Sequence, residues 1–393
     1  MKRKGCTRTI LLALAAFAGL CLVLAAISVV INVRQPTRSE VLDRLSAVEK
    51  IRVAEAIHLR KTMGDQVLPG WAQADIPVIV YNEEMLFLVG LADPAPGWRK
   101  IPQGTQLGGV WELVPDDDFF GQPYYRQKYP SPGVNSQAFT VQVGEHWAES
   151  LSTYEWTRIA LVNEIAGQLP GPIQRIVPAP LLRNLLLPGS DAYASLFLHE
   201  ATHAYQGIRA PERLNAAENA ARTSMAEYPI EDLAHKEAWQ HELDLLHQAV
   251  RAKTQEETIR LAREFLNQRA ERRKAAGLSK EMIALEQLKE WEEGIAKYSE
   301  RTIYVLAMQD ESYQPLPEVQ RDEDFHDYQL AQQKWDQEVD QIRRMAGDDG
   351  DGRFYYTGFA QAVLLDRLTP GWKDRLFEDG IWLEDLLSEA VRP

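Results

Sequence analysis

The pattern of apolar and polar positions divides the chain into three parts of different character. Residues 10–31 form a continuous apolar run in which only Ser28 is distinctly polar. From about 68 to 185, short runs rich in β-branched and aromatic residues alternate with segments dense in proline and glycine, which predicts strands and turns. From 186 onward, apolar residues recur at helical spacing, which predicts a mainly helical region.

Individual elements follow from the same pattern. The apolar runs 76–81 and 85–90 flank Asn82, Glu83 and Glu84, which predicts a hairpin. We expect further strands at 105–113 and 138–143 and a helix at 159–166. An amphipathic helix is predicted at 39–62, and longer helices at 231–252, 255–276, 279–308 and 327–346, with two more between 356 and 391.

The N-terminal apolar run has the length of a membrane span. Twenty-two residues at about 1.5 Å each cover roughly 33 Å, enough to cross a bilayer. The basic residues Lys2, Arg3 and Lys4 would stay cytoplasmic and leave the bulk of the chain outside. A cleavable signal peptide is the alternative, but its apolar core is usually only about 7 to 15 residues. We therefore predict an uncleaved anchor at 10–33 and a single-pass protein of the cell membrane.

The most informative motif is the H-E-x-x-H sequence at 199–203. It lies in a predicted helix that follows Pro188 and Gly189, with Ser190 and Asp191 as candidate N-caps. On a helix, His199 and His203 lie one turn apart on the same face, and Glu200 projects from nearly the same side. Two imidazole ligands beside a carboxylate base are what a zinc hydrolase needs. A metal would also remove the cost of burying this polar triplet.

A catalytic zinc site wants a third protein ligand. No histidine or cysteine follows His203 at a useful short spacing, so a carboxylate is expected. The segment Trp291-Glu292-Glu293-Gly294-Ile295-Ala296-Lys297-Tyr298 resembles the segment that supplies the glutamate ligand in the gluzincin branch of the H-E-x-x-H metallopeptidases. The resemblance implies that Glu293 binds the metal and that Gly294 lets another helix approach closely. Glu218, which lies nearer to His203, is the alternative ligand.

The resemblance also implies a mechanism, in which a zinc-activated water hydrolyses a peptide bond. Glu200 would accept the proton from that water and pass it to the leaving amine. Enzymes of this kind use a tyrosine or histidine to stabilise the developing oxyanion. Tyr355 and Tyr356 are the candidates here. Neighbouring residues point different ways on a helix, so at most one of them qualifies, and we assign the role to Tyr356.

Composition removes some classes of function. The net charge of −14, with no offsetting basic stripe, argues against nucleic-acid binding. Both cysteines, Cys6 and Cys21, lie in the N-terminal apolar region, so the rest of the chain can form neither a disulfide nor a cysteine metal site. His, Asp and Glu remain as metal ligands.

Together these patterns predict an α+β protein with an N-terminal transmembrane helix, a small α+β region and a mainly α-helical, zincin-like catalytic domain. The expected parts are a cytoplasmic tail (1–9), the anchor (10–33), an amphipathic stalk helix (34–67), the α+β region (68–185) and the helical domain (186–393). The predicted function is a membrane-anchored zinc peptidase that acts on peptides or proteins outside the cytoplasm. The alternatives are a catalytically silent binding protein of the cell envelope and a zinc hydrolase of a non-peptide bond.

Overall fold

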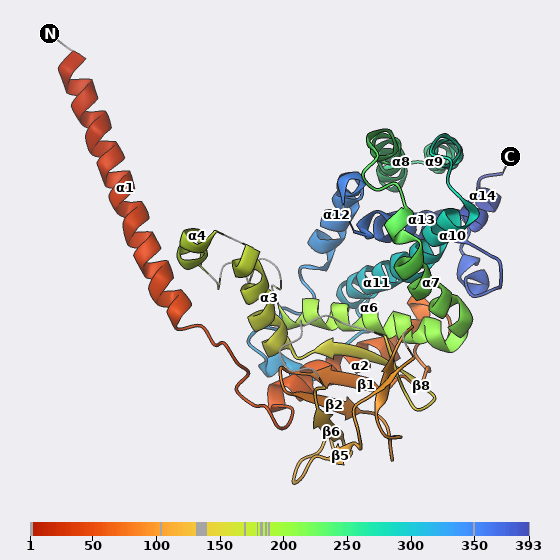
Figure 1. The fold of residues 1–393 in the computed structure, drawn as a ribbon, viewed down its shortest axis with the longest axis horizontal. Helices are drawn as coiled ribbons and strands as arrows, with labels where there is room; N and C mark the ends of the chain where they lie inside the picture. Colours follow the sequence, from red (N-terminus) through yellow and green to blue (C-terminus); the bar gives the residue numbers. More distant parts are fainter. Residues whose placement is uncertain are drawn as a thin grey trace.

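The computed structural model describes residues 3–102, 104–130, 140–168, 170–178, 180, 184, 187, 189–348 and 350–392. Helix α1 (Arg3–Val33) projects from one side of the molecule, as Figure 1 shows in red. In the rest of the molecule the strands gather on one side and most of the helices on the other, with α6 (Ser190–Arg209) running between the two groups.

The remaining elements follow in chain order. The N-terminal half contains α2 (Ala47–Val67), β1 (Val78–Tyr81), β2 (Met85–Val89), β3 (Trp98–Lys100), β4 (Gln106–Leu107), β5 (Glu112–Leu113), β6 (Tyr125–Lys128), β7 (Val141–Val143), β8 (His146–Ser152), α3 (Tyr154–Gln168) and α4 (Gly171–Ile176). After α6 come α7 (Pro211–Thr223), η1 (Met225–Glu227), α8 (Leu233–Arg251), α9 (Gln255–Ala275), α10 (Lys280–Lys289), η2 (Glu290–Gly294), α11 (Ile295–Gln309), η3 (Val319–Arg321), α12 (Ala331–Gln341), η4 (Ile342–Gly347), α13 (Gly352–Leu368), η5 (Trp372–Arg375) and α14 (Leu383–Ala390).

The strands form one eight-stranded sheet in the order β4-β3-β7-β8-β1-β2-β6-β5. The predicted hairpin is confirmed: β1 pairs with β2 antiparallel, with Val78 opposite Val89 and Tyr81 opposite Leu86. Strand β8 pairs with β1 in parallel, and the other neighbours are antiparallel. The strand expected at 138–143 corresponds to β7 (Val141–Val143). Residues 138 and 139 of the expected strand lie outside the described residues.

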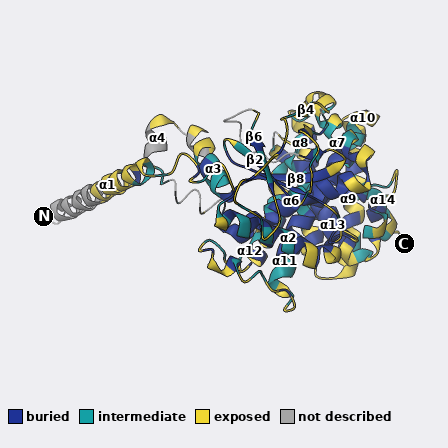
Figure 2. Ribbon diagram, turned by 90° about the horizontal axis from the view of Figure 1, so that it is seen from below, coloured by how far each residue is buried: buried dark blue, intermediate teal, exposed yellow. Residues whose placement is uncertain are grey.

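Alternation along the strands separates two apolar layers, because successive strand residues face opposite sides of a sheet. Val78 and Val80 of β1 belong to a core that also contains Tyr193 and Phe197 of α6. Between them in the chain, Ile79 packs on the other face among residues such as Trp98, Trp111 and Val143. The helix that carries the H-E-x-x-H motif therefore rests directly on the sheet, and in Figure 2 it lies in the middle of the body, among buried residues.

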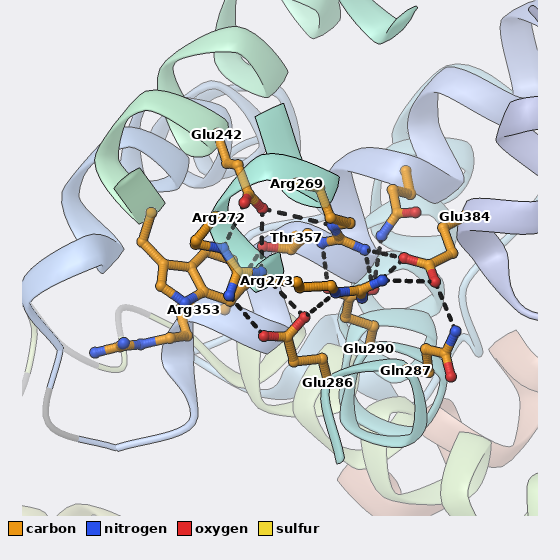
Figure 3. A network of polar contacts seen from close by, with 12 residues as sticks. Glu242, Arg269, Arg272, Arg273, Glu286, Gln287, Glu290, Arg353, Thr357 and Glu384 are labelled. Carbon is orange, nitrogen blue, oxygen red and sulfur yellow. Dashed lines mark hydrogen bonds and ion pairs between the residues drawn. The ribbon is translucent and has the colours of Figure 1, made fainter. Parts of the chain in front are cut away.

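A buried cluster of arginines and glutamates, which we call the Arg–Glu network, ties the last helices together (Figure 3). It comprises Arg269, Arg272 and Arg273 of α9, Glu242 of α8, Glu286 of α10, Glu290 of η2 and Glu384 of α14. Arg269 Nη2 donates to Glu290 Oε1 at 2.5 Å, and Arg272 Nη1 donates to Glu286 Oε1 at 2.7 Å. The network therefore holds α10 and η2 firmly on the side that faces α9.

The predicted fold class is wrong in two respects. The strands expected in a small separate region build one eight-stranded sheet on which the motif helix packs. Among the described residues, no helix is both long and apolar enough to cross a membrane, which contradicts the predicted transmembrane anchor and the single-pass location.

Candidate metal centre

Three side chains meet at one point between α6 and η2. His199 Nε2 lies 3.4 Å from Glu293 Oε2, and His203 Nε2 lies 3.3 Å from the same oxygen. The two imidazole rings stand edge to face, with their centroids 4.9 Å apart. One ligand atom from each residue lies within 4.8 Å of the others, so the group can hold a metal ion. The structure thus brings together the three residues that the sequence predicted as metal ligands.

The donor set fits a metal ion in its burial as well as in its spacing. The side chains of His199, His203 and Glu293 are only 12%, 7% and 12% exposed. Glu293 Oε2 is buried and has no hydrogen-bond partner among the described residues. A buried carboxylate oxygen without a partner is costly. A cation between this oxygen and the two imidazoles would offset that cost, which supports the fit.

Helix α6 presents the two histidines from a well-packed support. It begins at Ser190 with Gly189 as N-cap, so neither Ser190 nor Asp191 caps it as predicted. Asp191 is instead buried and accepts a hydrogen bond from the Tyr304 hydroxyl at 2.9 Å. Apolar residues on the sheet-facing side bury the helix, which leaves the histidine side turned toward α11 and η2.

The outer nitrogen of each imidazole has an acceptor that fixes the ring. His199 Nδ1 lies 3.4 Å from Glu300 Oε2, and His203 Nδ1 lies 3.0 Å from Gln206 Oε1. Such acceptors favour the tautomer whose Nε2 lone pair is free for a metal. Gln206 Nε2 also donates to the backbone oxygens of Trp291 and Glu292, at 2.7 and 3.0 Å. The motif helix is thereby bonded to the backbone that carries Glu293.

The predicted continuous helix 279–308 is interrupted by η2, a π-helical turn over Glu290–Gly294. A π-turn adds a residue to the helix and is common at functional sites. Here it carries both Glu293 and the two carbonyl groups that Gln206 binds. The expected close helix approach at Gly294 is confirmed: a Cβ there would overlap the backbone of Gly358 in α13, and a Cβ on Gly358 would overlap the Glu290 carbonyl.

Lys289 is a residue of this centre that the sequence analysis missed. Its ammonium group lies 2.6 Å from Glu292 Oε2 and 3.1 Å from Glu293 Oε1, and its side chain is only 4% exposed. Lys289 therefore engages one oxygen of Glu293 while the other faces the histidines. The spacing of four residues between Lys289 and Glu293 is a sequence signal that could have revealed the pair. Burial would raise the pKa of Glu293, but Lys289 and the histidines hold it well below its usual range.

The two other predicted carboxylates lie close by, without being part of the ligand group. Glu218 of α7 is partly buried. Burial raises its pKa, and Lys289, His203 and Glu293 also influence it. It nevertheless falls outside the metal-capable group found among the described residues. Glu200 is half-buried; burial raises its pKa, and the two neighbouring histidines partly oppose this shift.

The two tyrosines of α13 point to different places, as adjacent residues on a helix must. The ring of Tyr355 is stacked on His199, with centroids 6.0 Å apart and planes at 10°. Burial and the Glu293 carboxylate hold the pKa of Tyr355 far above its usual range. The hydroxyl of Tyr356 donates to Glu338 Oε2 at 2.5 Å. The structure thus places Tyr355, rather than the predicted Tyr356, against the metal ligands.

Nearby glutamates raise the pKa values of both histidines. Burial alone would lower the pKa of His203, but Glu293 outweighs burial and raises it to about 10. Burial would also lower the pKa of His199, and Glu293 with Glu300 raises it above its usual value. Without a metal, protons on these imidazoles supply the positive charge that Glu293 requires. A divalent cation would displace those protons, since metal ligands bind deprotonated.

Comparison of the chain with family models, with curated proteins and with solved structures found no match. The geometry of the centre is therefore the basis for assigning it a chemistry. The centre contains two imidazoles, one carboxylate whose Oε2 has no hydrogen-bond partner among the described residues, a second carboxylate at Glu200, and a tyrosine stacked on His199.

Proposed function

We propose that this protein is a zinc-dependent peptidase of the gluzincin type, with His199, His203 and Glu293 as metal ligands. The observation that carries the proposal is the convergence of both Nε2 atoms on the unpartnered Oε2 of Glu293. Two neutral nitrogens and one carboxylate are a ligand set that catalytic zinc uses, with a further position left open. Zinc is favoured over magnesium or calcium because imidazole ligands suit it better than they suit those hard cations.

Bound zinc would supply positive charge that polarises a carbonyl group and makes a water molecule more acidic. Glu200 follows His199 directly in the chain, and its raised pKa brings it closer to the range in which a carboxylate works as general base at neutral pH. Its carboxylate would accept the proton from the attacking water and deliver it to the leaving amine. Glu300 and Gln206 would keep the two imidazoles in the ligating orientation throughout.

Tyr355 takes the role of oxyanion donor in this proposal. Because its pKa is raised, its hydroxyl keeps its proton and can donate to an oxygen that gains negative charge. Donors of this kind are typically worth about 3 to 4 kcal/mol in the transition state. Tyr356, whose hydroxyl is bound to Glu338, would act only indirectly, by holding α12 against α13.

The test measures zinc and cleavage in the same samples. Wild-type protein should bind one zinc ion per chain and cleave members of a peptide library. Glu200→Gln should retain zinc while its kcat falls by about 10²- to 10⁴-fold. Glu212→Gln, which alters an exposed glutamate on α7, should leave both properties unchanged.

Other outcomes would redirect the proposal. Zinc binding without cleavage of any peptide would point to a non-peptide substrate or to a silent binding protein. Failure to bind zinc, or cleavage that survives in Glu200→Gln, would contradict the mechanism.

A further inference from the structure

A cavity of about 510 Å³ lies beside α2, away from the metal ligands. It is bounded by α2, by the segment that leads into β1, by the end of β2, by the 119–122 loop and by residues 316 and 318. Its volume falls in the range of about 300 to 1,000 Å³ that is typical of small-molecule sites. None of the three metal ligands lines it, so the cavity requires an explanation of its own.

Most of the cavity wall is apolar. Ile57, Ile76, Val78, Val89 and Leu316 contribute aliphatic groups, and Phe119 and Phe120 contribute a pair of aromatic rings in edge-to-face contact. Phe120 is 52% exposed although it is a large apolar residue. Its φ of +52° is a backbone conformation that a bulky residue seldom adopts. An exposed phenylalanine held in this way, at the rim of an apolar cavity, fits contact with an apolar ligand.

Arg60 supplies the one deeply buried charge in the wall. It is only 2% exposed, and Nη1 donates to the carbonyls of Trp71 and Ala74 at 2.8 and 3.0 Å. Nε is buried without a hydrogen-bond partner, and neither it nor Nη2 makes a hydrogen bond within the part of the chain that the structure describes. Nε is fully covered by the protein, whereas Nη2 is not among the fully covered atoms, so Nη2 is the guanidinium nitrogen that can donate a charge-assisted hydrogen bond to a carboxylate in the cavity.

No acid of the described chain neutralises Arg60 at ion-pair distance. Glu149 of β8 is a buried acid that acts on Arg60 electrostatically, and its Oε2 also has no hydrogen-bond partner among the described residues. Burial raises the pKa of Glu149 to about 8, so this group is mostly uncharged at neutral pH. The carboxylate of Asp75 is 78% exposed and lies 3.6 Å from His146 Nδ1. A buried guanidinium without an acidic partner is costly, and an anion from outside the chain would offset that cost.

We propose that the cavity binds a monocarboxylate with an apolar body, and that its carboxylate pairs with Nη2 of Arg60. Among the other charged groups in the wall, Lys61 favours an anion and Glu318 and Asp75 oppose it. Of all of these, only Arg60 is almost completely buried. The apolar body would lie against the aliphatic wall and the two phenylalanines. This site is separate from the proposed peptidase chemistry and does not depend on a bound metal.

Calorimetric titration of the full chain with octanoate tests the proposal. Octanoate should bind at one site, while acetate, which lacks the tail, and octylammonium, which carries the opposite charge, should bind at least about tenfold more weakly. N-acetyl-leucyl-leucine carries the same chemistry at a peptide terminus. A tenfold preference for either acid identifies the source of the carboxylate, and both should require Arg60.

Two variants separate recognition from folding. Arg60→Met should weaken octanoate binding by at least about tenfold. Lys61→Met removes an exposed neighbouring charge and should change it by less than about twofold. If Arg60→Met unfolds, Ala54→Phe provides the independent test, because it keeps Arg60 and fills the cavity. Equal binding of octylammonium, equal loss in Lys61→Met, undiminished binding in Ala54→Phe, or no octanoate binding by wild type would each overturn the proposal.

Discussion

The segment from α10 to η2 carries glutamates that face two different regions, and these regions differ in the partners they offer to the carboxylates. Toward α9, Glu286 and Glu290 meet arginines in the Arg–Glu network. Toward α6, Glu293 Oε2 lies at ion-pair distance from the Nε2 atoms of two histidines but accepts no hydrogen bond from the described residues. Both regions are buried, so the difference lies in how the carboxylates are hydrogen-bonded. Both oxygens of each glutamate in the network accept a hydrogen bond from an arginine, which supports the fold, whereas Glu293 Oε2 accepts none from the described residues and is suited to an added cation.

The largest change in stability is expected from removing an arginine of the network. The side chain of Arg272 is fully buried and is bonded to both Glu242 and Glu286. Arg272→Met leaves these two acids short of positive charge and should lower the free energy of unfolding by about 3 to 5 kcal/mol. Urea unfolding measures the loss. Arg260→Met, which breaks an exposed pair with Glu264, should cost less than about 1 kcal/mol.

Removal of Glu293, the carboxylate proposed to bind the metal, should affect metal affinity more than stability. Glu293→Ala should weaken zinc affinity by more than about 100-fold. It should change the stability of the metal-free protein far less than Arg272→Met does, because Lys289 keeps Glu292 as a partner. Competition with a chelating dye gives the affinity. Glu218→Ala is the matched control. If zinc affinity fell in Glu218→Ala and stayed unchanged in Glu293→Ala, the third ligand would be Glu218 instead.

Acid should affect the network through Glu384. Burial alone would raise its pKa, but Arg269 and Arg273 lower it to about 2, from an ordinary value of 4.5. A carboxyl group with a lowered pKa in the folded state stabilises the fold above its unfolded pKa. This contribution should be lost as the pH falls from about 4.5 toward 2. Urea midpoints of the metal-free protein across this range should fall more steeply for wild type than for Glu384→Gln; parallel curves would contradict the assignment.

The smallest effect is expected from replacing Lys289, which pairs with both Glu292 and Glu293. Lys289→Met frees Glu293 Oε1 from its partner, so the carboxylate loses its fixed orientation. Zinc affinity should fall by about tenfold, as measured by the same dye competition. Lys289→Arg should lose less affinity than Lys289→Met. The control variant Lys280→Met, at an exposed position of α10, should keep the wild-type affinity. An unchanged affinity in Lys289→Met would show that Lys289 does not position the ligand.

The sequence predicted those features of the site that depend on short-range geometry. The spacing of four residues between His199 and His203 requires only a helix, and the strand pattern on both sides of Asn82 requires only a hairpin. The place of Glu293 came from a resemblance between segments, because nothing local indicates that a residue ninety positions later returns to the motif helix.

Features that depend on long-range packing escaped prediction. The direction of Tyr355 depends on how α13 is rotated, and the backbone contact of Gly294 with Gly358 helps to fix that rotation. The π-turn at 290–294 falls within an ordinary helical pattern, so the sequence predicted an unbroken helix. The single sheet is built from residues 78–152, and β8 inserts beside β1 about seventy residues after it. An alternating pattern does not specify such a neighbour.

The contact of two bare backbones at Gly294 and Gly358 has a consequence for how an ion would be captured. With no side chain between them, neither helix can turn about its axis without displacing the other. The positions of Glu293 and Tyr355 are consequently set by folding, before any ion arrives. Capture should then proceed without a slow gathering of ligands, at a rate governed by desolvation of the incoming cation.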